Sequence, residues 1–472
     1  MQFKRRAFLA GGSAAVLAGA APRLARSQTQ VDVAIIGAGL AGLNAARLCE
    51  AQGLSVTVLE AENRIGGRLH TLDELPRAPE AGGIQIGAGY ARLHSIAAEL
   101  GVALSSDQGA GAGRVQTPGN LYWIDGARTT AADWTAKADN PLADPVFQAE
   151  PAALLRQFSG GLTRFDKPED WLDAEESWDV SVAMALRKAG ASPSALRLIE
   201  ANFNGNDLAS MSQLHLARSF AIFRSQPGPI STIAGGSQRL PEAMAGALAG
   251  DVRLGTKVRA ISEEASGVRL LLEEGELHAR QVICTIPFAA LRHIPIASSL
   301  SPALARMIAQ LPYTRASFAY LTASEPFWQD DRFPDTLWTD DPLLGRVFVL
   351  SDGSGESPPM LKLWTTGAGA DMLDRMPADR ARTEIIARVE RARPSARGKI
   401  GDVTFYSWQR NPNARGIYHH IGTGMARDLA KATRETRSQL HFAGEHLAQA
   451  SSGMEGALES GERAALAVLA LA

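Results

Sequence analysis

The chain has 472 residues, of which 45% are hydrophobic, and its 48 Lys and Arg against 50 Asp and Glu leave a formal net charge of −2 at pH 7. This length suffices for two domains, each with its own core, and the balanced charge argues against a nucleic-acid-binding protein. The two cysteines, Cys49 and Cys284, stand in apolar stretches, so we expect buried thiols rather than a disulfide or a metal site.

Residues 1–30 are predicted to be a leader and linker outside the fold. The pair Arg5-Arg6 is followed by an apolar stretch rich in Ala and Gly and by a small-residue cleavage pattern. The apolar run is about fifteen residues, shorter than the roughly 20 that a membrane span needs. The pattern resembles a bacterial Tat signal, which exports proteins already folded. We therefore expect a periplasmic protein without a stable membrane anchor, its mature chain beginning near Ala21.

Residues 31–61 read as a strand, a glycine turn, a helix and a second strand: "VDVAIIGAGLAGLNAARLCEAQGLSVTVLEA". Gly37, Gly39 and Gly42 form the G-x-G-x-x-G turn, which lets backbone N–H groups approach a pyrophosphate at the start of the helix. Glu60 ends the second strand, where a carboxylate can accept hydrogen bonds from ribose hydroxyls. The pattern predicts a dinucleotide site and leaves NAD and FAD both open.

The next residues carry a more specific motif. In "ENRIGGRLHT", an R-x-G-G-R element places Arg64, Gly66, Gly67 and Arg68 just beyond Glu60. This element resembles the flavin-containing amine oxidase family, which includes monoamine, polyamine and L-amino-acid oxidases. The resemblance implies FAD as the cofactor and an α/β fold. A Rossmann-like FAD-binding domain assembled from discontinuous segments would carry a mixed α+β substrate-binding domain.

Later segments extend the resemblance over most of residues 30–470. "EAGGIQIG" resembles the family segment that passes beside the flavin, and the backbone of Val258 in "VRLGTKVRAI" would contact the adenine side. "GEHLAQASSGMEGALESGERAA" resembles the closing FAD motif, whose helix would point its N-terminal amides at the flavin pyrimidine. The cofactor-binding residues implied in this way are Gly37, Gly39, Ala41, Gly42, Glu60, Ala61, Arg64, Gly67, Arg68, Gly83, Ile84, Gln85, Val258, Gly444, Glu445, Gly453 and Met454.

The domain boundaries follow from the order of these segments. The FAD-binding domain is expected to comprise 31–85, 231–294 and 411–472. The substrate-binding domain is expected to comprise 86–230, mostly helical, and 295–410. In the second insertion, "ASFAYLTA" and "PMLKLWTT" read as strands and residues 378–393 as a helix.

The resemblance also implies the chemistry. A hydride would pass from the carbon next to nitrogen to flavin N5, and water would hydrolyse the imine to a carbonyl compound and an amine or ammonia. The electrons would go to O2, giving H2O2, or to another acceptor. The protein would supply orientation and an apolar pocket. Tyr418 matches one aromatic wall of the family's amine cage, whereas Gly453 stands where the second wall is expected, which leaves room for a bulkier substrate.

Three departures from the family pattern bear on function. Ile417 replaces the cysteine of covalently flavinylated relatives, so FAD is expected to be non-covalent. Gln85 stands where amino-acid oxidases of the family commonly have a carboxylate-binding arginine, which favours a plain amine over an amino acid. Phe318 occupies the position of a lysine that assists oxygen reduction. No lysine is expected nearby and Arg315 is the closest cation, so either oxygen reacts slowly and another acceptor, such as a periplasmic redox protein, takes the electrons, or the pocket has been rebuilt.

Two other classes of function stay open. One is an L-amino-acid oxidase or a flavin desaturase on the same fold, and the other is a flavin-bearing protein without turnover. The expected partners are a small-molecule amine and the electron acceptor, without nucleic acid or metal. The sequence leaves a homodimer open.

Overall fold

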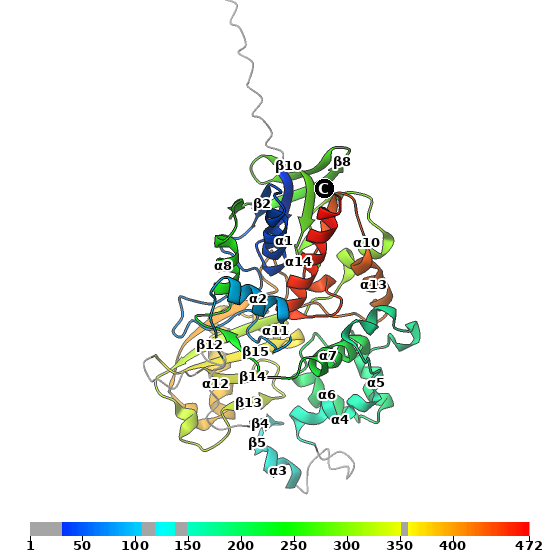
Figure 1. Ribbon diagram of the computed structural model, residues 1–472. Coiled ribbons are helices and arrows are strands. Elements are labelled where there is room, and N and C mark those ends of the chain that lie inside the picture. Colours follow the sequence, from blue (N-terminus) through cyan, green and yellow to red (C-terminus); the bar gives the residue numbers. More distant parts are fainter. Residues whose placement is uncertain (1–30, 106–118, 137–148, 351–356, 472) are drawn as a thin grey trace, which may run out of the picture.

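The computed structural model describes residues 31–105, 119–136, 149–350 and 357–471, so the expected leader lies outside the described residues. Two large sheets lie at opposite ends of the folded structure, and a group of helices packs beside the second sheet (Figure 1). The expected strand–turn–helix–strand unit is present as β1 (Val31–Ile36), α1 (Leu40–Ala51) and β2 (Val56–Leu59).

The first sheet draws its strands from three distant parts of the sequence. Its order is β11-β8-β9-β10-β1-β2-β7, with β17 also paired to β10. The remaining strands are β7 (Asp251–Arg253), β8 (Val258–Glu264), β9 (Gly267–Leu272), β10 (Glu276–Cys284), β11 (Ile296–Ala297) and β17 (Leu440–Phe442). Because β11 pairs with β8, this sheet continues past the boundary expected at residue 294.

Parallel pairing forms the centre of this sheet. β1 is parallel to both β2 and β10, and the C-terminal half of β10 is parallel to β17. The carboxyl ends of strands from the beginning, middle and end of the chain therefore meet at one edge, which is where open α/β sheets bind ligands.

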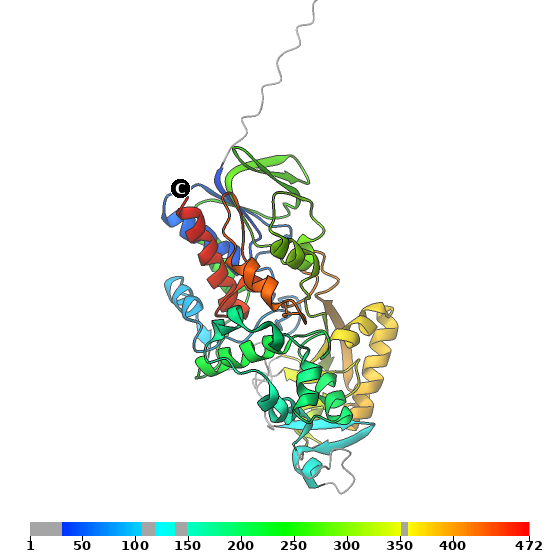
Figure 2. The ribbon, with the colours of Figure 1, turned by 90° about the vertical axis from the view of Figure 1, so that its right-hand side faces the viewer.

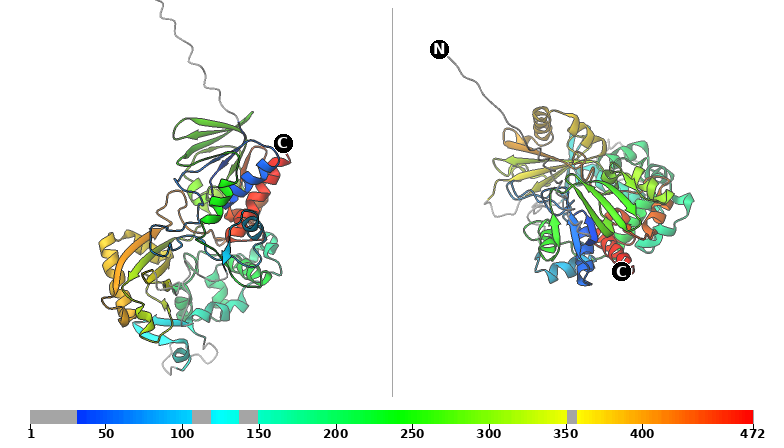
Figure 3. Two further views of the ribbon diagram at one scale, coloured as in Figure 1. Left: turned by 60° about the vertical axis from the view of Figure 1, so that its left-hand side comes forward. Right: turned by 90° about the horizontal axis from the view of Figure 1, so that it is seen from above.

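Helices α1 and α14 (Gly453–Leu469) lie side by side against this sheet (Figure 1, and Figure 3, left). Their approach is close, because a Cβ on Gly461 would lie 2.2 Å from the carbonyl oxygen of Ala41. Only glycine fits there, so the C-terminal helix is held against the helix that follows the first glycine turn.

The second sheet has the order β16-β12-β15-β14-β13-β4-β5. Its strands are β4 (Asn120–Ile124), β5 (Ala127–Thr130), β12 (Ala316–Ala323), β13 (Thr336–Thr339), β14 (Arg346–Leu350), β15 (Met360–Thr366) and β16 (Ile400–Ser407). The two strands expected in the second insertion are confirmed, as is the helix, α12 (Ala378–Ala392), which covers the outer face of the sheet (Figure 2).

Residues of β12 alternate between two faces of this sheet. Ala319 and Leu321 pack on the side of α12, in a cluster with Ile385. Phe318 and Tyr320 belong to a separate cluster on the inner face. The period-2 alternation of a strand thus directs one set of aromatic side chains away from α12 and towards the first sheet.

The helical insertion contains α4 (Leu154–Phe158), α5 (Val182–Lys188), α6 (Pro193–Ala201) and α7 (Gln213–Ser225). Arg218 of α7 donates hydrogen bonds to the carbonyls of Ala448 (2.8 Å) and Ser451 (2.7 Å), and the indole N–H of Trp171 donates to that of Gln449 (2.9 Å). These bonds hold the insertion against the segment that leads into α14.

The remaining α-helices and strands are short. They are α2 (Ala91–Glu99), α3 (Ala131–Ala136), α8 (Arg239–Gly246), α9 (Phe288–Leu291), α10 (Pro302–Gln310), α11 (Gly367–Arg375), α13 (Ala426–Arg434), β3 (Leu104–Ser105) and β6 (Thr232–Ile233). In the part of the chain that the structure describes, no helix is both long enough and apolar enough to cross a membrane.

Candidate active site

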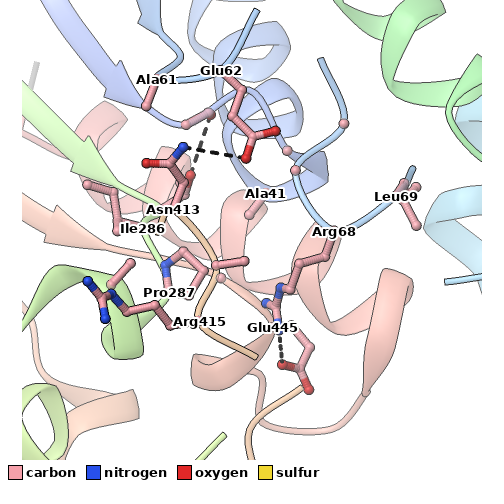
Figure 4. Close-up of a pocket in the computed structure, with 18 of the residues that line it drawn as sticks. Ala41, Ala61, Glu62, Arg68, Leu69, Ile286, Pro287, Asn413, Arg415 and Glu445 are labelled. Carbon is pink, nitrogen blue, oxygen red and sulfur yellow. Dashed lines mark hydrogen bonds and ion pairs between the residues drawn. The ribbon is translucent and has the colours of Figure 1, made fainter. Parts of the chain in front are cut away.

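A cavity of about 440 Å³ lies at the carboxyl ends of the parallel strands and extends to the inner face of the second sheet. Its lining comes from the first glycine turn, the R-x-G-G-R turn, the ends of β2 and β10, β12, β15, the segment around Tyr418 and the start of α14. Segments from both ends of the chain therefore enclose one space (Figure 4).

The first glycine turn brings bare backbone to the cavity. Gly37 has φ +109°, and a Cβ there would lie 2.4 Å from Oγ1 of Thr285. Thr285 follows β10 and donates to the carbonyl of Ile36 (2.8 Å). Gly39 and Gly67 also line the cavity. Two glycine turns and a helix start without side chains in the way form a cradle that fits a pyrophosphate.

Glu60 lies beside this cradle with its carboxylate already held in place. Oε2 accepts from the N–H of Ala38 (2.8 Å) and Oε1 from the N–H of Glu62 (2.8 Å). Burial raises the pKa of this carboxyl, and the two N–H groups offset part of that effect. A carboxylate has lone pairs for further donors. Glu60 therefore fits the expected role of binding ribose hydroxyls.

Replacing Glu60 with alanine is expected to weaken FAD binding by on the order of 1–3 kcal/mol, the value of lost hydrogen bonds to a charged group. Reconstitution of apoprotein with FAD, followed by flavin fluorescence, gives the dissociation constant. Glu99→Ala is the matched control, because Glu99 pairs with Arg47 at the surface with 60% of its side chain exposed. Equal FAD affinity in Glu60→Ala and wild type would contradict the assignment.

The two arginines of the R-x-G-G-R element have different places. Arg64 does not line the cavity: it donates to the carbonyls of Gly67 (2.6 Å) and Leu69 (3.0 Å) and so holds the second glycine turn in shape. Arg68 lines the cavity, contacts the carboxylate of Glu445 at 3.4 Å and donates to the carbonyl of Ile417 (Figure 4).

Glu445 connects the closing motif to the segment around Tyr418. Its Oε2 lies 3.1 Å from Nδ1 of His419 as well as 3.4 Å from Arg68. Burial opposes the charged form, but His419 and Arg68 outweigh it and hold the pKa of this carboxyl well below its ordinary range. Glu445 is therefore ionised at neutral pH and fixes Arg68 at the cavity wall.

Aromatic side chains form the end of the cavity on the second sheet. Phe318, Trp364, Trp408 and Tyr418 line it there. The hydroxyl of Tyr418 donates to the carbonyl of Asn204 at 3.4 Å, and burial raises the pKa of this phenol to about 12. An apolar aromatic end of this kind favours a neutral over a charged amine.

The expectation that no lysine lies near Phe318 is wrong. Nζ of Lys362 lies 4.7 Å from the ring centroid of Phe318 and 5.2 Å from that of Trp364, and it donates to the carbonyl of Glu80 (2.6 Å). The antiparallel pairing of β12 with β15 sets Lys362 directly opposite Tyr320. Burial lowers the pKa of this ammonium to about 8. Phe318 lines the cavity and Lys362 does not.

The hydroxyl of Tyr90 borders the space beside Gly453. Gly453 and Met454 line the cavity at the start of α14. A Cβ on Gly453 would lie 3.3 Å from the hydroxyl oxygen of Tyr90, which precedes α2. The position where the second aromatic wall was expected therefore lies next to a phenol from another part of the chain.

The other expected cofactor-binding residues divide into two groups. Ala41, Ala61, Gly83, Val258 and Gly444 line the cavity, whereas Gly42, Ile84 and Gln85 do not. A Cβ on Gly42 would lie 2.0 Å from the carbonyl oxygen of Gly37, so Gly42 serves the packing of helix on turn. Gln85 is exposed.

Several lining residues were missed, among them Thr285, Pro287, Asn413 and Arg415. The position of Thr285 and Pro287 directly after an apolar strand was a usable signal, because that strand ends at the same sheet edge as β1. Asn413 offered no such signal. Its side-chain amide nitrogen lies 3.5 Å from a carboxylate oxygen of Glu62, which is far away in the sequence (Figure 4).

Comparison with known proteins assigns the family. Residues 40–469 match the model of the flavin containing amine oxidoreductases, and the chain belongs to that family. The protein is thus a flavin-dependent oxidoreductase with the Rossmann-like FAD-binding fold that the first glycine motifs predict.

Two curated relatives span nearly the whole chain. AofH of Mycobacterium tuberculosis (strain H37Rv), named as a flavin-containing monoamine oxidase, is 28% identical over 475 residues, which covers 95% of this chain and 100% of AofH. The flavin-dependent L-tryptophan oxidase RebO of Lentzea aerocolonigenes is 25% identical, over 94% of this chain and 98% of RebO.

Solved structures show the same fold. Cyclohexylamine oxidase from Brevibacterium oxydans IH-35A superposes with a TM-score of 0.76 at 24% identity, over 93% of this chain and 98% of that one. Wild-type putrescine oxidase bound to putrescine gives a TM-score of 0.74 at 22% identity, over 93% and 99%.

The cofactor is FAD, and the cavity fits it. The glycine cradle suits the pyrophosphate, Glu60 the ribose and the aromatic end the flavin ring. The binding is non-covalent: Ile417, which lines the cavity, has no thiol to form a thioether, and neither Cys49 nor Cys284 lines the cavity. In the described ranges, no three His, Cys, Asp or Glu side chains are grouped so as to hold a metal ion.

Proposed function

We propose that the protein oxidises a small-molecule amine at the carbon next to nitrogen, and that water converts the resulting imine to a carbonyl compound and an amine or ammonia. The observation that carries this proposal is the aromatic end of the cavity, where Tyr418 stands with Phe318, Trp364 and Trp408. FAD, when bound, supplies the electron-accepting chemistry. The chain's own residues exclude water, favour the neutral amine and orient it.

A second candidate is an L-amino-acid oxidase, and the similarity to RebO favours it. The exposed Gln85 counts against a carboxylate contact from the Gly-Gly segment. Anaerobic reduction of the bound flavin by paired amines and L-amino acids distinguishes the two. Reduction by amines alone supports the proposal, reduction by amino acids alone supports the alternative, and reduction by neither points to a protein without turnover.

We propose further that oxygen reoxidises the flavin slowly relative to reduction. Phe318 lines the cavity at the position where the family resemblance implies a lysine that assists oxygen reduction. The ammonium of Lys362 is buried behind Phe318, with only 2% of the residue exposed. Stopped-flow measurement of the two half-reactions tests this. Faster turnover with an artificial electron acceptor would support a separate periplasmic acceptor. Rapid reoxidation in air would contradict the proposal that oxygen reacts slowly.

Export by a Tat-type signal is proposed from the Arg5-Arg6 pair. Replacing both residues with lysine is expected to leave active, flavin-loaded protein in the cytoplasm, because that pathway reads the twin arginine. Fractionation of cells with compartment markers measures it. The matched control replaces Arg23 and Arg26 with lysine, beyond the apolar stretch, and should leave export intact. Undiminished export of the Arg5, Arg6 variant would contradict the proposal.

A further inference from the structure

A second cavity, of about 730 Å³, lies next to the aromatic end of the first. Trp364 lines both cavities, and the hydroxyl of Tyr418 donates to the carbonyl of Asn204, which lines the second (3.4 Å). The helical insertion forms one side of this cavity, and β14, β15 and α11 form the other. Tyr418 and Trp364 therefore stand between the FAD site and a space inside the substrate-binding region.

The acidic side chains of the second cavity already have partners. Asp340 pairs with Arg197 (2.7 Å), Asp207 accepts from the N–H groups of Ala209 (3.0 Å) and Ser210 (2.6 Å), and Glu200 accepts from the N–H of Leu208 (3.3 Å). These carboxylates stabilise the surrounding loops and helices. They are poor candidates for holding a cationic ligand.

Arg346 differs from the three other arginines that line this cavity, of which Arg187 is exposed to solvent. Arg197 pairs with Asp340, and Arg315 pairs with Asp371 (3.2 Å). Arg346, half-buried at the start of β14, donates to the side-chain oxygen of Asn204 and lies 5.8 Å from the ring centroid of Phe348. Among the residues that the structure describes, no carboxylate lies within ion-pair distance of it.

The surroundings of Arg346 disfavour an isolated charge. Burial lowers the pKa of this guanidinium, and the neighbouring Tyr418 only partly offsets that effect. A partly buried cation with a neutral partner is costly unless an anion completes it. A guanidinium has five N–H donors, so the contact with Asn204 leaves donors for two oxygens of a carboxylate.

We infer that Arg346 and Asn204 form an anion-binding subsite, and that the substrate is an amine that carries a carboxylate remote from its nitrogen. The inference rests on the proposed amine oxidation. With the amine beside Tyr418 in the first cavity, the acidic end of the molecule extends into the second and meets Arg346. The contact differs from the α-carboxylate contact of an amino-acid oxidase, because it lies on the hydroxyl side of Tyr418.

The test compares 4-(aminomethyl)benzoate with benzylamine, which differ only in the remote carboxylate. In anaerobic reduction of the holoenzyme, 4-(aminomethyl)benzoate is expected to reach half-saturation at a concentration at least about tenfold lower than benzylamine does. This is the effect of a charge-assisted hydrogen-bond pair. Arg346→Gln should bring the ratio of the two concentrations close to one. Arg382→Gln, an equal charge change on α12 at a site paired with Asp402, should leave the ratio unchanged.

Binding of 4-methylbenzoate, which has no amine to oxidise, separates this inference from the proposed function. Isothermal titration should detect its binding to wild type and its loss in Arg346→Gln, even if no amine reduces the flavin. Equal half-saturation of the two amines in wild type would overturn the inference. So would a carboxylate preference that survives Arg346→Gln, or a preference confined to L-phenylalanine over 2-phenylethylamine.

Discussion

Anaerobic reduction of the bound flavin by an amine is expected to slow about tenfold or more when Tyr418 is replaced by alanine. The phenol lines the aromatic end of the FAD cavity, and its hydroxyl bond to Asn204 fixes its direction. A lost orienting contact worth about 1.4 kcal/mol lowers a rate tenfold. Stopped-flow absorbance at the flavin band, at saturating amine, measures the rate.

The control for this prediction is Tyr418→Phe, which keeps the ring and removes only the hydroxyl. It should retain most of the rate if the aromatic surface orients the amine. The backbone carbonyl of Tyr418 accepts from the N–H of Thr314 (2.9 Å), which holds this segment in place. Flavin content equal to wild type in both variants shows that the segment has not moved. A wild-type rate in a fully loaded Tyr418→Ala protein would show that this residue does not orient the substrate.

The largest effect on stability is expected at Glu445. Replacement with alanine should lower the free energy of unfolding by about 3–5 kcal/mol, because the buried Nδ1 of His419 and the Arg68 guanidinium both lose their carboxylate partner. Chemical denaturation of the apoprotein measures it, so that changes in FAD binding do not enter. Removing Glu99 from its exposed pair with Arg47 should cost only about 0–1 kcal/mol.

The Glu445 effect should depend on pH in a defined direction. The pKa of this carboxyl is far lower in the folded chain than its ordinary value of 4.5. Its stabilisation is therefore fully present above about pH 4.5 and is lost as pH falls through the folded pKa. The difference in unfolding free energy between wild type and Glu445→Ala should stay constant near neutral pH and shrink in acid. A difference that grows below pH 4.5 would contradict the assignment.

Local backbone chemistry made much of the FAD site predictable. The glycines of the first turn, the short distance to Glu60 and the R-x-G-G-R turn act within single stretches of chain, and such stretches impose their conformation almost regardless of context. Gly37, at φ +109°, is an example, because few other residues adopt that backbone. The strands 316–323 and 360–366 followed equally from their own residue pattern.

The sequence by itself thus determined the fold class, the cofactor and the segments that hold it. Tertiary structure alone decided which side chains from separate segments meet. Strand pairing sets Lys362 beside Phe318, helix packing brings the hydroxyl of Tyr90 to Gly453, and the helical insertion brings Asn204 to Arg346. Such pairs depend on strand register and on how helices pack, which are set by burial over the whole core and leave no short-range pattern in the chain.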